Sequence, residues 1–106
     1  MSDKVRFTAP IKTYLIEEGY DPMHFVTVTG EAAEQVAGYE LVRRLEYGKR
    51  RGFGSVKVEV RLGSSTWKTS VFPMKEGGWF LPLKKPVRLA EGLAEGDEVE
   101  VALTLI

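Results

Sequence analysis

Strict alternation of apolar and polar residues is the feature that most limits how this chain can fold. Within residues 55–62, the charged side chains Lys57, Glu59 and Arg61 alternate with aliphatic ones. Glu98–Leu105 repeats the alternation, with valine or leucine at every second position. Successive side chains of a β-strand point to opposite faces, so both segments are predicted to be strands with one buried face.

Four more strands are predicted from alternation and turn signals. Residues 63–65 have turn composition, so the segment after them is predicted to pair with residues 55–62 as a hairpin. Pro10 has no amide proton, which marks a sheet edge or a bulge within the first strand. The four strands are residues 5–16, 23–29, 66–72 and 79–83.

Two helices are predicted. The longer one, residues 31–47, begins with acidic and ends with basic side chains, which suits the helix dipole. Gly38 lies in its middle and leaves a break there open. The shorter one, residues 85–93, has Pro86 at its first position and Gly92 at its C-terminal cap.

This mixture of elements favours a mainly β fold. An open sheet of about six short strands exposes two edges, and closure into a barrel removes them. We therefore predict a small, partly open antiparallel β-barrel with one longer helix, which plugs or caps it, and one short helical turn. A length of 106 residues is typical of a single domain, so residues 1–106 are expected to form one domain.

Composition excludes several kinds of chemistry. The absence of cysteine excludes disulfides, thiolate metal sites and cysteine nucleophiles, and it suits a reducing compartment. His24 is the one histidine, and we predict no metal, no cofactor and no catalytic residue. The N-terminus lacks a signal sequence and no apolar run approaches 18 residues, so a cytoplasmic protein without membrane contact is expected.

Charge is unevenly distributed although the net charge is zero. Residues 1–42 carry three basic and seven acidic side chains, residues 43–88 carry twelve and three, and residues 89–106 carry none and five. The net charges are therefore −4, +9 and −5. The central basic segment, residues 43–88, predicts contact with an anionic partner such as nucleic acid, a phosphorylated metabolite or an acidic protein.

Two groups of cations in the central basic segment are candidate anion-binding residues. The first runs into a glycine-rich stretch with an aromatic residue, which could hold phosphates and stack a base; the alternative is a solvated helix end. Whether the second group shares a surface with the first is left open. Of the two tryptophans, the one beside two glycines is predicted to be the more exposed and is a candidate ligand platform; the alternative for both is packing in the core or at the barrel rim. The candidates are Arg43, Arg44, Lys49, Arg50, Arg51, Lys84, Lys85, Arg88 and Trp79.

Residues 52–105 also resemble a known family. GFGSVKVEV, TWKTSVFP and GGWFLPLKKPVRLAEGLAEGDEVEV are similar in order and spacing to the bacterial family catalogued as domain of unknown function 1905. The most specific elements are Ser70 with Pro73, the run LPLKKPVR and the Gly-Asp turn at Asp97. The resemblance implies a small, partly open β-barrel with no established biochemical role.

A second, local resemblance covers residues 81–101. LPLKKPVR, the short helix and EGDEV resemble the half-barrel of AbrB-like and MazE-like regulators. Those regulators are dimers that bind DNA through basic residues around this motif. The resemblance therefore implies a DNA contact at the basic residues of this run, although this chain has a second half-barrel of its own.

These patterns predict a non-enzymatic binding module that contacts an anionic partner through the central basic segment. The alternative is a small-molecule-binding or enzymatic domain that uses the barrel mouth, with His24, Trp67 and Trp79 as its candidates. We expect a monomer or a small homo-oligomer.

Overall fold

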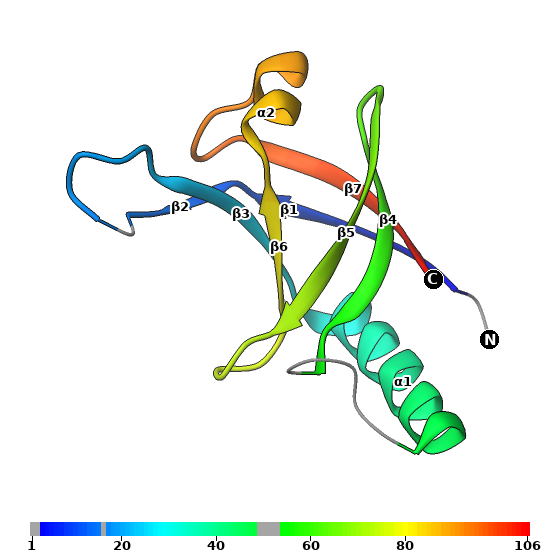
Figure 1. Ribbon diagram of the computed structural model, residues 1–106. Helices are drawn as coiled ribbons and strands as arrows, with labels where there is room; N and C mark the ends of the chain where they lie inside the picture. The colour runs from blue at the N-terminus through cyan, green and yellow to red at the C-terminus, as the bar shows by residue number, and fades with distance from the viewer. Residues whose placement is uncertain (1–2, 16, 49–53) are drawn as a thin grey trace.

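The strands form one curled antiparallel sheet, flanked at one end by a long helix (Figure 1). The computed structural model describes residues 3–15, 17–48 and 54–106. Within these ranges there are seven strands and two helices. The strands are β1 (Lys4–Pro10), β2 (Lys12–Tyr14), β3 (Met23–Val28), β4 (Val56–Leu62), β5 (Ser65–Pro73), β6 (Trp79–Leu83) and β7 (Glu98–Leu105).

The two edge strands of the sheet, β1 and β2, follow one another in the chain and are separated only by Ile11. The strand order is β1-β7-β4-β5-β6-β3-β2, so β1 pairs with β7 at one end and β2 with β3 at the other. The sheet is open between β5 and β6, which pair in the described part of the chain only at Phe72 with Phe80 and at Pro73 with Trp79. The result is a curled half-barrel, which confirms the predicted mainly β, partly open barrel.

The core is built from the inward faces of these strands. Burial along β4 alternates as predicted, with Val58 and Val60 fully buried and Arg61 exposed. β7 shows the same alternation. Burying one such aliphatic side chain contributes about 1.5–3 kcal/mol relative to leaving it exposed. The predicted strand alternation therefore supplies the main stabilising contacts of the fold.

The long helix α1 (Gly30–Tyr47) runs without interruption through Gly38, so the break that the sequence left open does not occur. It ends at Gly48, whose φ of 75° lies in the left-handed region that glycine adopts easily. In this conformation the Gly48 N–H donates to the carbonyl of Arg44 at 2.8 Å.

The first half of α1 packs most closely on the barrel. Ala32 and Val36 are its buried residues among those described. The second half projects beyond the sheet (Figure 1), and Leu45 there is 74 % exposed. The helix therefore caps the barrel and does not plug it.

The short helix α2 (Lys85–Glu91) connects β6 to the segment before β7. Pro86 lies in its first turn and Gly92, with a φ of 63°, ends it, as predicted. α2 stands beside the tip of the β4–β5 hairpin (Figure 1). Neither helix within the described ranges is long and apolar enough to cross a membrane.

The first predicted strand is two strands, because the chain bends at Ile11. Pro10 has no amide proton to donate, and the backbone of Ile11 bonds to a turn of the C-terminal segment. Its N–H donates to the carbonyl of Asp97 at 2.9 Å, and its carbonyl accepts from the N–H of Gly96 at 2.8 Å. This turn thereby separates β1 from β2.

Candidate functional site

Two arginines flank a small residue on the outer face of the sheet. β7 lies between β1 and β4, and the register places Ala102 opposite Arg6 on one side and Arg61 on the other. Both arginines are exposed, and Ala102 is half-buried between them. Adjacent strands lie about 4.8 Å apart, so the two arginine backbones stand about 10 Å apart. Their long side chains can converge over the alanine methyl group.

Neither arginine has a partner in the described part of the chain. The ion pairs found there join Arg44 to Glu40 and Lys85 to Asp21. Neither Arg6 nor Arg61 takes part in a hydrogen bond or ring contact there either. Two neighbouring cations that form no ion pair within the described residues are available to bind an anion.

The two arginines line an open groove with a volume of about 640 Å³. Its walls come from β1, β4 and β7 and from the end of α2. Sites for small molecules have volumes of about 300–1,000 Å³, so the groove has room for a small ligand. The charged residues that line it are Arg6, Arg61, Glu91, Glu98 and Glu100.

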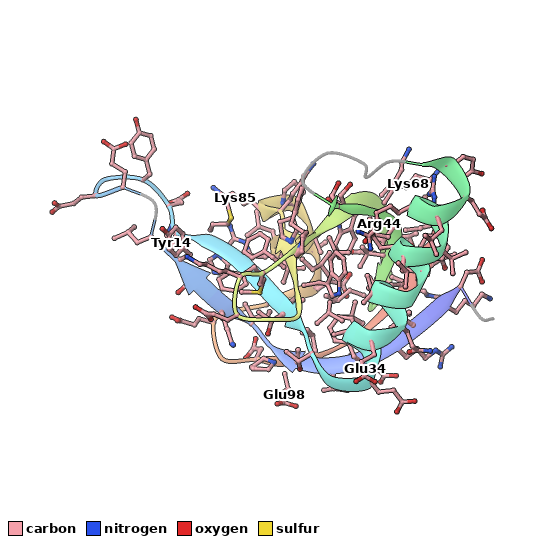
Figure 2. The ribbon with its side chains drawn as sticks, turned by 90° about the horizontal axis from the view of Figure 1, so that it is seen from below. Tyr14, Glu34, Arg44, Lys68, Lys85 and Glu98 are labelled. Atoms are coloured by element: carbon pink, nitrogen blue, oxygen red, sulfur yellow. The ribbon has the colours of Figure 1, made fainter. Side chains whose placement is uncertain are left out.

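The glutamates of the groove come from two elements. Glu98 and Glu100 are exposed on β7, where Figure 2 shows Glu98 pointing away from the barrel. Glu91 is the last residue of α2. In the described residues, no three side chains of histidine, cysteine, aspartate or glutamate are grouped so that they could hold a metal ion. The glutamates carry negative charge and can accept hydrogen bonds.

Glu91 fixes one wall of the groove by joining α2 to the tip of the β4–β5 hairpin. Its carboxylate accepts hydrogen bonds from Ser65 Oγ at 2.6 Å, from Ser64 Oγ at 3.2 Å and from the Ser64 N–H at 3.4 Å. Gly63 makes this approach feasible. Its φ is 60°, and a Cβ atom there would collide with the Glu91 carboxylate.

These contacts predict a pH dependence of stability. The Ser65 hydroxyl lowers the pKa of the Glu91 carboxyl below its ordinary value of 4.5, while partial desolvation opposes the change and Ser64 adds to it. A carboxyl whose pKa is lower in the folded state stabilises the fold above its unfolded pKa, and this contribution is lost as the pH falls through the folded pKa. Glu91→Gln is therefore expected to lower the urea midpoint near neutral pH, and to have less effect in acid.

The matched control for this prediction is Glu76→Gln, since Glu76 is exposed in the turn between β5 and β6 and has no described partner. Its urea midpoint is expected to follow that of the unmodified protein at each pH. If Glu91→Gln destabilised the protein equally near neutral pH and well below the pKa of the Glu91 carboxyl, the carboxylate would not be the stabilising species.

Arg43 of the first predicted cation group is held by contacts within the protein. It donates to the carbonyl of Ile106 at 2.9 Å. Its guanidinium also lies 5.8 Å from the ring centre of Tyr39 and 5.6 Å from that of Tyr47. Such contacts are worth about 0.5–1 kcal/mol each at exposed sites, so Arg43 contributes to the packing of α1.

The rest of the first group divides in two. Arg44 is half-buried and pairs with Glu40 at 3.6 Å, one helical turn earlier. This pairing agrees with the alternative interpretation of these residues as a helix end. Lys49, Arg50 and Arg51 lie outside the described residues, and their role stays a prediction.

The second predicted group lies around α2. Lys84 and Lys85 are exposed, and Lys85 Nζ is 4.0 Å from the carboxylate of Asp21. Arg88 is half-buried, with its Nη1 3.4 Å from Nε2 of His24. The two lysines are therefore accessible, whereas Arg88 is partly engaged in packing.

The structure does not bring the two cation groups together. α2 lies at the top of the view in Figure 1 and the C-terminal half of α1 at the bottom. In the perpendicular view, Lys85 and Arg44 again stand apart (Figure 2). Among the described residues, these groups form two separate surfaces.

The predicted exposure of Trp79 is wrong. Trp79 is 7 % exposed, and its indole N–H donates to the carbonyl of Ala33 in α1 at 3.2 Å. The helix covers the ring, so the neighbouring glycines do not open it to solvent. Trp67 packs, half-buried, against the core. Packing thus accounts for both tryptophans considered as ligand contacts.

Sequence reasoning missed the arginine pair. Alternation places Arg61 on the outward face of its strand, but Arg6 lies in another strand far away in the sequence. Their proximity depends on the fact that β1 and β4 both pair with β7. The register of β1, β7 and β4 is the information needed to predict the site.

By its architecture, the chain is a small, mainly β protein in which a half-barrel carries a charged groove on its outer face. A family model for Domain of unknown function (DUF1905) matches residues 7–103, and the chain belongs to this family. The match includes Arg61 and Ala102 and begins one residue after Arg6. No curated protein matches the chain in sequence. The local resemblance to AbrB-like regulators stays a prediction.

Proposed function

We propose that the protein is a non-enzymatic binding domain for an anionic partner, and that Arg6 and Arg61 hold the anionic group. The observation that carries the proposal is the register in which both arginines flank Ala102 while neither has a described partner. A guanidinium presents a fork of N–H donors that matches a carboxylate or a phosphate. Two such forks facing one another can hold one anion from both sides.

The small residue between the arginines supports the proposal. A long side chain at position 102 would fill the space over β7 where the two guanidinium groups can meet. Ala102 leaves this space open.

The β4–β5 hairpin carries further cations, together with Glu59, on the same outward face. Lys57 and Lys68 lie on the outward faces of β4 and β5, in the same hairpin as Arg61. All three belong to the central basic segment, so its charge supports the proposal through this hairpin. Lys84 and Lys85 stay proposed as a second contact for a large partner.

The experiment is a titration of the isotopically labelled protein with inorganic phosphate, in which the backbone amide chemical shifts are measured at each step. The expected result is a saturable shift at Ala102 and its neighbours. Arg6→Gln and Arg61→Gln are each expected to weaken binding about tenfold or more, since a hydrogen bond to a charged group contributes about 1.5–3 kcal/mol. Lys75→Gln removes a cation from the exposed β5–β6 turn and is the matched control. Unchanged affinity in both arginine variants would overturn the proposal.

Nucleic acid is one specific anionic partner, and a separate binding experiment tests for it. Retention of DNA or RNA oligonucleotides should fall steeply with salt, because neutralised phosphates release counterions. Retention that survives Arg61→Gln but not the double variant Lys84→Gln/Lys85→Gln would place the contact on α2. No retention at low salt would remove nucleic acid and leave a small anion as the partner.

A further inference from the structure

The groove contains charges of both signs that form no ion pairs with one another in the described residues. Glu98 and Glu100 lie on the outward face of β7, on the same strand as Ala102. In the part of the chain that the structure describes, neither glutamate forms an ion pair with Arg6 or Arg61. Opposite charges that share a groove but stay unpaired are available to a ligand.

The charges are arranged in rows across the sheet. Ala102 pairs with Arg6 and Arg61, whereas Glu100, two residues earlier, pairs with Thr8. Two residues of a strand span about 7 Å, so the acidic row lies about 7 Å from the cationic row. A ligand along the groove therefore meets two arginines at one point and Glu100, with Glu98 beyond it, at the next.

We propose that the groove takes a short peptide with free termini, such as a dipeptide, with its carboxylate between Arg6 and Arg61 and its amine at Glu100. The inference rests on the proposed function, because it uses the same two arginines. Two extended residues span about 7 Å, which matches the separation of the rows. The ammonium group has three N–H donors, and Glu100 and Glu98 supply carboxylate acceptors.

Other charge patterns fit the groove less well. A dianion such as a diphosphate would place its second charge beside Glu100, where like charges repel. A diamine would place a cation beside Arg6 and Arg61. Only a ligand with opposite charges at its two ends satisfies both rows, and the attraction at each end fixes its direction in the groove.

The test compares glycylglycine with its two capped forms, N-acetylglycylglycine and glycylglycinamide, by the same amide-shift titration. Glycine has no side chain, so these probes isolate recognition of the termini. Glycylglycine is expected to bind most tightly. Either cap is expected to weaken binding about tenfold, because each removes one charged hydrogen-bonding group.

Variants separate the two ends of the ligand. Glu100→Gln is expected to weaken the binding of glycylglycine and to leave N-acetylglycylglycine unaffected, whereas Arg61→Gln weakens both. Glu76→Gln is the control for removal of an exposed carboxylate. Equal affinity for the free and the acetylated dipeptide would overturn this inference and leave anion binding intact. If neither dipeptide nor phosphate shifted Ala102, both proposals would fail.

Discussion

The double variant Arg6→Gln/Arg61→Gln is expected to lose binding of inorganic phosphate by about a hundredfold or more while it keeps its fold. The two side chains point outward from the sheet, and neither has a described partner. Substitutions at such positions usually change the free energy of unfolding by no more than about 0.5 kcal/mol. Two charge-assisted contacts to one anion together contribute about 3–6 kcal/mol, so the loss of affinity should far exceed any loss of stability.

The measurement is a double-mutant cycle in phosphate affinity, with a urea denaturation curve for each variant. If both arginines contact one anion, the double variant should lose more affinity than either single variant, and any departure from additivity measures the coupling between the two arginines. The control is Lys12→Gln/Lys75→Gln, which makes the same change in net charge at two exposed residues outside the groove. An equal loss of affinity in this control would show that total charge, and not the arginine pair, determines binding.

Leu81→Ala is expected to lower the free energy of unfolding by about 2–5 kcal/mol, the range for removal of a buried leucine side chain. Leu81 is fully buried on β6, opposite Val26. β6 has little hydrogen-bonded support from β5, because the two strands pair at two described positions only. Between β5 and β6, side-chain packing therefore contributes more of the contact than backbone pairing does, and a cavity at Leu81 weakens this packing.

The matched control is Leu89→Ala, the same chemical change at a residue of α2 that is 70 % exposed. It is expected to change the free energy of unfolding by no more than about 0.5 kcal/mol. Urea denaturation followed by tryptophan fluorescence measures both. A loss of less than about 1 kcal/mol for Leu81→Ala would mean that the neighbouring side chains close the cavity, and that packing at β6 is not limiting.

Alternation made most of the strands predictable. The boundaries of Trp79–Leu83 and Glu98–Leu105 agree with the structure, because each strand lies between clear turn signals and buries every second residue. The same reasoning fails at the end of the first predicted strand, residues 5–16, where Leu15 has the parity of the buried Val5 and Ile11 but is 59 % exposed. The alternation of apolar and polar residues continues in the sequence beyond Ile11, where the strand is interrupted. This interruption depends on a turn near the other end of the chain.

The candidate site was less predictable because charge was considered along the sequence. Arg44 and Lys85 belong to one basic segment, yet they lie on α1 and α2, which stand at separate ends of the molecule (Figure 1). Arg6 belongs to a segment with a negative total and stands in register with Arg61. Trp79 was misjudged for a related reason, since the helix that covers it comes from an earlier part of the chain. Register and long-range contacts do not follow from composition.

The floor of the groove is β7, which follows every other described strand in the chain. Its pairing with β1 joins residues as distant as Lys4 and Thr104. During synthesis both arginines and the local β4–β5 hairpin are present before β7 exists, and long-range pairing of this kind forms late. A nascent chain, or one shortened before β7, therefore has both arginines but no site. Ligand binding at the groove would report that β7 has joined the sheet and that the barrel has folded.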